Sequence, residues 1–283
     1  KLALDSHKLT QAVNKGFDVR DQDEAYWVDH KVCSHATGKY MNFDGFYIEH
    51  ESLIQSKYQQ VSFYEYPELH DKCLELETTV QICANYRPYY HEPFVHFPAT
   101  LLPSLPRRVV FVGGGDAMLL QEILKYPSIE KVIGLELDQV VVRNSFKHFN
   151  TQPHFDDPRV EWWFGDATKT LNVLPKEYFG SFDLVLIDLS ETVMSFTVTK
   201  SLNVIQALAL LAKPDGIVVK NEHYFSEFSK IFDHTIELAH RTNPVICDQH
   251  FAMGSNRVDF MKPQFDRVEG IETLLYKPLQ NRT

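Results

Sequence analysis

The sequence predicts an α/β fold in which a doubly wound parallel sheet follows a small antiparallel β-sheet. Two patterns carry this prediction. Apolar and polar residues alternate over residues 45–77, and short apolar runs alternate with helical segments from residue 109 onward. A turn of consecutive glycines after the first of those runs is the third observation. With 283 residues, the chain is long enough for one large α/β domain and a smaller one.

The small sheet is predicted from the alternation of period two, which is typical of half-buried strands. The pattern covers residues 45–51, 59–66 and 72–77. We therefore expect an antiparallel β domain over residues 45–87. Residues 1–44 are polar and mixed in character, and we expect them to form a partly ordered N-terminal extension.

The remaining residues, 88–283, are predicted to form the larger domain. A helix over residues 88–102 should end at Pro103, because proline interrupts a helix. Strands are expected at residues 109–112, 131–137, 160–164, 183–187, 217–220, 245–248 and 258–261. Helices are expected at residues 117–126, 139–149, 168–174, 199–212 and 225–239. Such an alternation predicts a parallel sheet that binds its ligand at the carboxyl ends of the strands.

The turn after the first of these strands consists of Gly113, Gly114 and Gly115, followed by Asp116. Glycines let the backbone approach a ligand closely and adopt a positive φ. A dinucleotide site would place its third glycine where Met118 stands, and a pyrophosphate would prefer bare backbone N–H groups to an acid. The turn therefore predicts a site for a nucleoside with a positively charged tail, such as a sulfonium.

Four predicted strands are followed by an acid, and these acids are Asp116, Glu136, Asp166 and Asp188. Because the carboxyl ends of parallel strands meet at one edge of the sheet, we expect the acids to line one crevice. Glu136 should bind the ribose hydroxyls. Asp166, with the adjacent Ala167, should lie beside the adenine edge. The alternative is that the acids are solvated residues of structural turns.

Asp188 is predicted to face the reactive carbon of the bound donor. Alkyl transfer to an amine requires the amine to lose its proton, and an alkylamine has a pKa of about 10. A carboxylate can orient the ammonium and accept or relay that proton, so we assign the catalytic role to Asp188. The alternative is that Asp188 caps the segment that follows it.

The acceptor amine is expected to bind at Tyr90, His91 and Glu92, where aromatic faces and a carboxylate could hold an alkylammonium. Glu222 follows the strand predicted at residues 217–220 and is a further candidate. Taken alone, both motifs are also compatible with ordinary structural roles.

Together these motifs resemble those of the polyamine synthases, the aminopropyltransferase family typified by spermidine, spermine and thermospermine synthases. The resemblance runs from about residue 45 to residue 262, and the His form of the Tyr90-His91-Glu92 motif resembles thermospermine synthases. The stretches that carry it are residues 55–59, 79–81, 90–96, 113–116, 129–132, 135–138 and 165–167.

The resemblance implies a Rossmann-like fold of the class I S-adenosylmethionine-dependent transferases and a binding site for decarboxylated S-adenosylmethionine. On this basis Gln59, Asp116, Glu136 and Asp166 contact the donor, and Asp188 is the catalytic acid. It also implies a homodimer formed through the N-terminal strands. The expected activity is aminopropyl transfer to a polyamine, a small cationic amine.

The predicted reaction loop departs from the family pattern Asp-x-x-Asp-Pro-x-Gly-Pro. Its second acid survives only as Glu191, and its proline and glycine are absent. Putrescine methyltransferases share this scaffold, so N-methyl transfer from intact S-adenosylmethionine is the alternative. That donor needs a cation for its carboxylate; Arg87 and Lys220 are candidates, although surface roles are expected for both. A non-catalytic relative is a third hypothesis.

Composition narrows the remaining possibilities. The net charge of −10 argues against nucleic acid as a partner. The sequence contains no run of about 18 apolar residues, so no membrane span is expected. The four cysteines lack CxxC spacing, so we expect reduced thiols in a cytoplasmic protein. His30, Cys33 and His35 lie close together, but no second ligand pair matches them, so no metal is expected.

Overall fold

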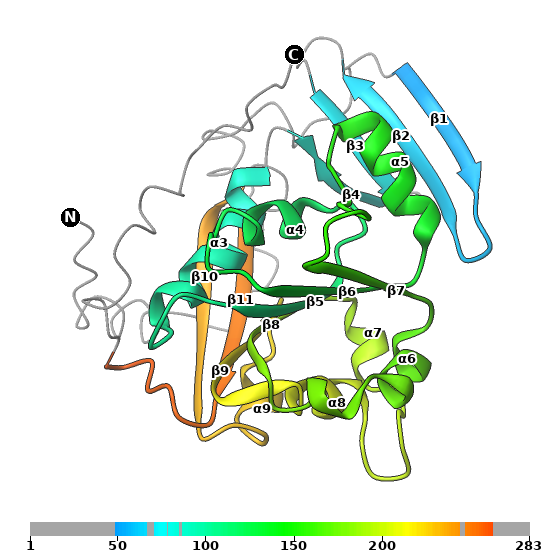
Figure 1. The fold of residues 1–283 in the computed structure, drawn as a ribbon. Coiled ribbons are helices and arrows are strands. Elements are labelled where there is room, and N and C mark those ends of the chain that lie inside the picture. Colours follow the sequence, from blue (N-terminus) through cyan, green and yellow to red (C-terminus); the bar gives the residue numbers. More distant parts are fainter. Residues whose placement is uncertain (1–48, 67–70, 78, 85–86, 244–246, 263–283) are drawn as a thin grey trace, which may run out of the picture.

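The computed structural model describes residues 49–262, apart from residues 67–70, 78, 85–86 and 244–246, and contains two separate sheets (Figure 1). The predicted N-terminal extension and the group His30, Cys33 and His35 lie outside the described residues. None of the described helices is long and apolar enough to span a membrane.

The smaller sheet is antiparallel, as predicted, and its strands follow one another in chain order. The strands are β1 (Glu49–Gln55), β2 (Gln60–Tyr66), β3 (Asp71–Leu76) and β4 (Thr79–Cys83). Alternate residues such as Val61 and Phe63 point to one buried face, where Met118 and Val141 of the larger domain complete a shared core. Helix α5 lies along this sheet (Figure 1). The small sheet is thus packed against the elements that carry the predicted donor site.

Cys73 and Cys83 form a disulfide between β3 and β4, which corrects the prediction of reduced thiols for this pair. The two residues are direct cross-strand partners with their Cα atoms 4.0 Å apart. The two cysteines are ten residues apart along the chain, and this spacing alone does not predict a disulfide. The pairing could be recognised only from the register of the hairpin. Cys33 and the side chain of Cys247 lie outside the described residues.

The larger sheet has the order β10-β11-β9-β8-β5-β6-β7. Strands β5 to β9 are parallel, whereas β11 runs antiparallel between β9 and β10. The bounds are β5 (Arg108–Gly113), β6 (Lys131–Glu136), β7 (Val160–Phe164), β8 (Phe182–Asp188), β9 (Ala212–Asn221), β10 (His234–Asn243) and β11 (Cys247–Ser255). Chain order reverses direction across the sheet between β5 and β8, and ligands bind at such a switch point.

Helices cover both faces of this sheet (Figure 1), which confirms the doubly wound α/β prediction. Residues of β5 alternate between the two cores: Val109 and Phe111 face α3 and α4, and Val110 and Val112 face α6 and α8. The helical elements are α3 (Arg87–Leu101), α4 (Met118–Ile123), α5 (Gln139–Phe149), α6 (Ala167–Val173), the short 3-10 turn η3 (Lys176–Tyr178), α7 (Glu191–Met194), α8 (Val204–Ala209) and α9 (Phe225–Phe228).

Three predictions near the C-terminal side of the sheet are wrong. The helix expected at residues 225–239 ends at Phe228, and β10 begins at His234. The strand expected at residues 258–261 does not form, because β11 already ends at Ser255. The helix expected at residues 199–212 is shorter, since Asn203 caps it with its side chain and β9 begins at Ala212.

Candidate active site

The glycine turn lies directly against the strand that carries Asp188. Gly113 pairs with Asp188 across β5 and β8, and its φ is +78°. A Cβ atom at Gly113 would lie 2.1 Å from the Asp188 carbonyl oxygen, so only glycine fits there. Gly114 also has a positive φ, of +70°. The two central strands therefore place the predicted catalytic acid beside the predicted donor turn.

Asp116 is buried at the end of the glycine turn. One carboxylate oxygen accepts the Met118 N–H at 2.8 Å, and the other lies 3.4 Å from Nε2 of His91 on α3. Burial would raise the pKa of Asp116, but His91, the Met118 N–H and Arg87 together hold it below its usual value. Asp116 is therefore a carboxylate that stays ionised inside the protein.

Glu136 ends β6 and lies next to the glycine turn. A Cβ atom on Gly115 would lie 3.1 Å from the Glu136 carboxylate. This carboxylate accepts the Asp138 N–H at 2.8 Å. Burial raises the pKa of Glu136 to about 7, and the neighbouring acids Asp138 and Asp116 contribute in the same direction. A carboxyl in this state can accept hydrogen bonds from hydroxyl groups and can also donate one when protonated.

Asp166 and Ala167 follow β7 next to Glu136. The Gly165 N–H donates to the Glu136 carbonyl oxygen at 2.8 Å, so the two strand ends are joined. One oxygen of Asp166 accepts the Thr168 N–H and hydroxyl and caps α6, which begins at Ala167. Asp166 therefore has the structural role that the alternative reading gave it, while its second oxygen is not used by this cap.

Asp188 lies in a hydrogen-bonded triad with Tyr90 and Asn221. The Tyr90 hydroxyl donates to Asp188 Oδ1 at 2.5 Å, and the Asn221 amide donates to the same oxygen at 2.8 Å. Burial raises the pKa of Asp188 above its usual value, and Asp116 adds to this, while Tyr90, His91 and Lys220 oppose it. Asp188 does not cap α7, whose N-cap residue is Ser190. The capping alternative is therefore not observed.

Asn221 was not predicted as a member of this site, and Lys220 was predicted only as a candidate cation for a donor carboxylate. Lys220 ends the run of apolar residues in β9 and is fully buried, so the surface role expected for it is wrong. Its ammonium donates to the Asn221 carbonyl oxygen at 2.7 Å and to the Asn221 side chain, and lies 3.3 Å from Glu222. A lysine at the carboxyl end of an otherwise apolar strand was the available sequence signal.

Gln59 and Glu92 lie outside this set of contacts, whereas Glu222 touches it through Lys220. Gln59 lies in the turn between β1 and β2, and no hydrogen bond joins its side chain to the acids within the described part of the chain. Glu92 is buried and faces Lys125 at 3.8 Å. Glu222 pairs with Lys220 and adopts a φ of 72°. Glu191 begins α7, but its side chain is outside the described residues.

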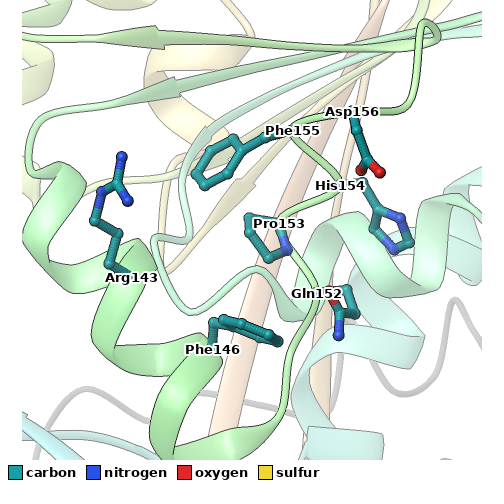
Figure 2. A pocket seen from close by; sticks show the side chains of 7 residues that line it. All are labelled: Arg143, Phe146, Gln152, Pro153, His154, Phe155 and Asp156. Atoms are coloured by element: carbon teal, nitrogen blue, oxygen red, sulfur yellow. The ribbon is translucent and has the colours of Figure 1, made fainter.

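A cavity of about 350 Å³ lies elsewhere, between α5 and the loop that leads to β7 (Figure 2). Phe155 of this loop packs edge-on against Trp162 and Phe164 of β7, the last strand at that edge of the sheet. None of the predicted site residues lines it; its lining residues are Arg143, Phe146, Gln152, Pro153, His154, Phe155 and Asp156. The row of acids at the strand ends is therefore a separate site.

The fold and the acids at its switch point define a Rossmann-like transferase, and comparison with known proteins identifies the family. The family model described as spermine/spermidine synthase domain matches residues 87–253. The chain therefore belongs to the spermine/spermidine synthase family. This confirms the resemblance drawn from the sequence motifs, and with it the prediction that the chain is an enzyme.

Relatives with assigned activities cover most of the chain. A polyamine aminopropyltransferase of Thermococcus onnurineus (strain NA1) is 31% identical over 245 residues, 81% of this chain and 84% of the relative. One of Thermoanaerobacter sp. (strain X514) is 29% identical over 220 residues, 73% of this chain and 78% of the relative. Putrescine N-methyltransferase 2 of Nicotiana attenuata is 32% identical over 179 residues, 62% of this chain and 47% of that protein.

The fold is also shared with a solved spermidine synthase. Its crystal structure, in complex with the transition-state analogue AdoDATO, superimposes with a TM-score of 0.63. The match covers 81% of this chain and 85% of that chain at 22% sequence identity. This likeness confirms the predicted fold class.

Proposed function

We propose that this protein transfers an aminopropyl group from decarboxylated S-adenosylmethionine to a polyamine. The observation that carries the proposal is the meeting of Asp116, Glu136 and Asp188 around a turn where only glycine fits. The donor is a sulfonium that carries an ammonium tail, and buried carboxylates stabilise such positive charges. The polyamine aminopropyltransferases among the relatives support the same reaction.

The donor would be held by the residues that follow β5, β6 and β7. Glu136 is assigned to the ribose hydroxyls, because a carboxyl with a pKa of about 7 can accept and donate hydrogen bonds there. Asp166 is assigned to the adenine amino group through the oxygen that does not cap α6. Asp116 is assigned to the ammonium of the aminopropyl group, because it stays ionised while buried. Gln59 is assigned to the donor by family resemblance.

The acceptor amine would be activated by Asp188. Its raised pKa makes it a stronger base than an ordinary aspartate, which favours removal of the ammonium proton. Tyr90 and Asn221 both donate to one oxygen of Asp188, so its second oxygen is oriented for the amine. As the amine nitrogen bonds to the donor carbon, the carbon–sulfur bond breaks and methylthioadenosine leaves. Asp188 takes the proton.

The cations next to the acids favour the decarboxylated donor. Intact S-adenosylmethionine carries a carboxylate, which needs a cationic partner. The ammonium of Lys220 is already bound by Asn221 and Glu222. The charge of Arg87 is offset by electrostatic interaction with the carboxylates of Asp116, Glu122 and Asp71. The methyl-transfer alternative is favoured by the altered reaction loop, in which residues 191–194 form the short helix α7, and by the relative from Nicotiana attenuata.

Product analysis distinguishes the two reactions. The purified protein is incubated with each donor and with putrescine or spermidine, and the products are identified by mass spectrometry. Our proposal expects methylthioadenosine and a polyamine longer by one aminopropyl group, formed from the decarboxylated donor. Formation of S-adenosylhomocysteine and a methylated amine from the intact donor would contradict it. The length of the amine used fastest identifies the acceptor.

We also propose that the protein is a homodimer, as the family resemblance implies. The small sheet supports this arrangement, because β1 lies at its edge and exposes 61% of Leu53. An edge strand with an exposed apolar side chain is a natural pairing surface for a second copy.

A further inference from the structure

Two histidines and a glutamate outside the row of acids form a compact cluster. Glu237 lies on β10, His250 lies on β11, and His223 lies in the segment that directly follows β9. These strands lie side by side at one side of the large sheet (Figure 1). The ligating atoms of the three side chains all lie within 4.8 Å of one another.

Strand register explains why the side chains meet. His250 pairs with Ala239 across β11 and β10, and Glu237 lies two residues before Ala239, so it projects from the same face of the sheet. The Glu222 N–H donates to the His250 carbonyl oxygen at 2.7 Å, which brings the next residue, His223, over β11. The two imidazole rings lie with their centroids 3.8 Å apart.

Both imidazoles direct the same nitrogen at one carboxylate oxygen. Nδ1 of His223 lies 2.7 Å from Glu237 Oε1, and Nδ1 of His250 lies 3.3 Å from the same atom. The second oxygen of Glu237 accepts the Phe225 N–H at 3.2 Å, which fixes the orientation of the carboxylate.

We propose that His223, Glu237 and His250 form a binding site for a divalent transition metal ion of the zinc class. Two imidazole nitrogens and one carboxylate oxygen are typical of sites that keep a fourth position open. Ligands at about 2.05 Å from a tetrahedral ion lie roughly 3.4 Å apart. The distance of 3.3 Å from His250 to Glu237 matches this separation, and the 2.7 Å from His223 to Glu237 would lengthen by less than 1 Å. His223 exposes 59% of its side chain, so the site is accessible from solvent and its ring can adjust.

The ligand set also indicates which ions should not bind. Mg²⁺ and Ca²⁺ prefer sites made entirely of oxygen ligands, whereas imidazole favours zinc, cobalt, nickel and copper. A bound transition metal would take both imidazoles, whose ring centroids lie 3.8 Å apart, as neutral ligands. The site would tie the end of β9 to β10 and β11 beside Asn221. It is independent of the transfer reaction proposed above.

The test is titration of the full chain, purified without a histidine tag and freed of metal by a chelator. Co²⁺ binding is followed by its visible absorption, Zn²⁺ by competition, and Mg²⁺ serves as the negative control. We expect one bound Co²⁺ that Zn²⁺ displaces. Saturating Zn²⁺ should raise the melting temperature by on the order of 5 °C, because the ion binds the folded state.

Variants connect the binding to this cluster. His223→Ala removes an exposed ligand and should still fold; Glu237→Gln keeps the shape of the carboxylate. Both should weaken Co²⁺ binding by at least about 100-fold, because losing even a residue that only orients a metal ligand costs about 10–100-fold. His234→Ala, on the same strand as Glu237, is the matched control and should bind normally. Absence of Co²⁺ binding to the wild type, or equal affinity in the wild type and both ligand variants, overturns the proposal.

Discussion

Substitution of Asp188 by asparagine tests the proposed base while leaving its surroundings nearly unchanged. The asparagine carbonyl oxygen can still accept from the Tyr90 hydroxyl and the Asn221 amide, which now donate to Asp188 Oδ1 at 2.5 and 2.8 Å. The side chain therefore keeps its shape and its oriented contacts. It loses the negative charge and the ability to take a proton from the acceptor amine.

The rate loss follows from the role assigned to this carboxylate. A positioned general base contributes about 10²–10⁴-fold, equal to roughly 3–5 kcal/mol of transition-state stabilisation. We expect the rate constant of the transfer step, measured in single-turnover experiments with saturating donor and acceptor, to fall by that factor. The affinity for the donor, measured by calorimetry, should change by less than about fivefold, because donor binding is assigned to Glu136, Asp166 and Asp116.

Asp188→Asn should slow the reaction but should not destabilise the folded protein. Burial raises the pKa of Asp188, so the folded protein holds this proton more tightly than the unfolded chain. Stability is therefore lost as the pH rises from the unfolded pKa to the folded pKa. Asp188→Asn has no such cost, and above the folded pKa it should be at least as stable as the wild type in urea denaturation.

Asp183→Asn is the matched control, because it lies at the other end of the same strand. Asp183 accepts the N–H groups of Arg107 and Arg108 at 2.8 Å and pairs with Lys213 at 2.6 Å. Its loss should lower the free energy of unfolding by about 1 kcal/mol and leave kcat unchanged. The assignment of Asp188 as base is refuted if Asp188→Asn keeps more than about one tenth of the wild-type rate.

Three further predictions address the donor site and the assembly. Burial raises the pKa of Glu136 to about 7, so the folded protein binds this proton more tightly than the unfolded chain does. The free energy of unfolding that this proton contributes is therefore lost as the pH rises from 4.5 to about 7. Glu136→Gln should therefore have a higher melting temperature than the wild type at about pH 8 but not near pH 4.5, and it should bind the donor more weakly. A difference in melting temperature between variant and wild type that is the same at both pH values contradicts this prediction. Gly113→Ala should lose more than about 2 kcal/mol in urea denaturation, whereas Gly180→Ala, at a similar φ of +68° but with no atom within 4 Å, should lose about 1 kcal/mol. Light scattering should show a wild-type dimer and a Leu53→Glu monomer; a monomeric wild type excludes the proposed assembly.

The central strands could be predicted from the sequence because their environment is uniform. In the middle of β5 and β8, both faces are covered by helices, so nearly every residue is apolar and the run stands out. The turns between these strands are equally informative, since a run such as Gly113, Gly114 and Gly115 has few structural explanations. Acids at the ends of such strands could then be placed at one edge without any knowledge of side-chain contacts.

The wrong helix at residues 225–239 shows where this reasoning ends. Ile236 and Leu238 pack against the core, and Glu237 between them faces the opposite side of β10. This alternation has period two, but with Phe228 and Phe232 upstream the same residues also fit helical spacing. Pairing with β11 decides the outcome, because the strand gains a continuous partner from His234 to His240. Local sequence contains no information about that partner.

The same limit separates the parts of the site that could be found from those that could not. Asp116 and Asp188 each follow their own strand, so each could be located alone. Asn221 joins the site through its contacts with Tyr90 and with Asp188, which is 33 residues away. The cluster around Glu237 depends on the register of β10 against β11. A shift of one residue in that register would turn His250 to the other face of the sheet. Functions that depend on pairing between distant strands therefore have to be inferred from the folded structure.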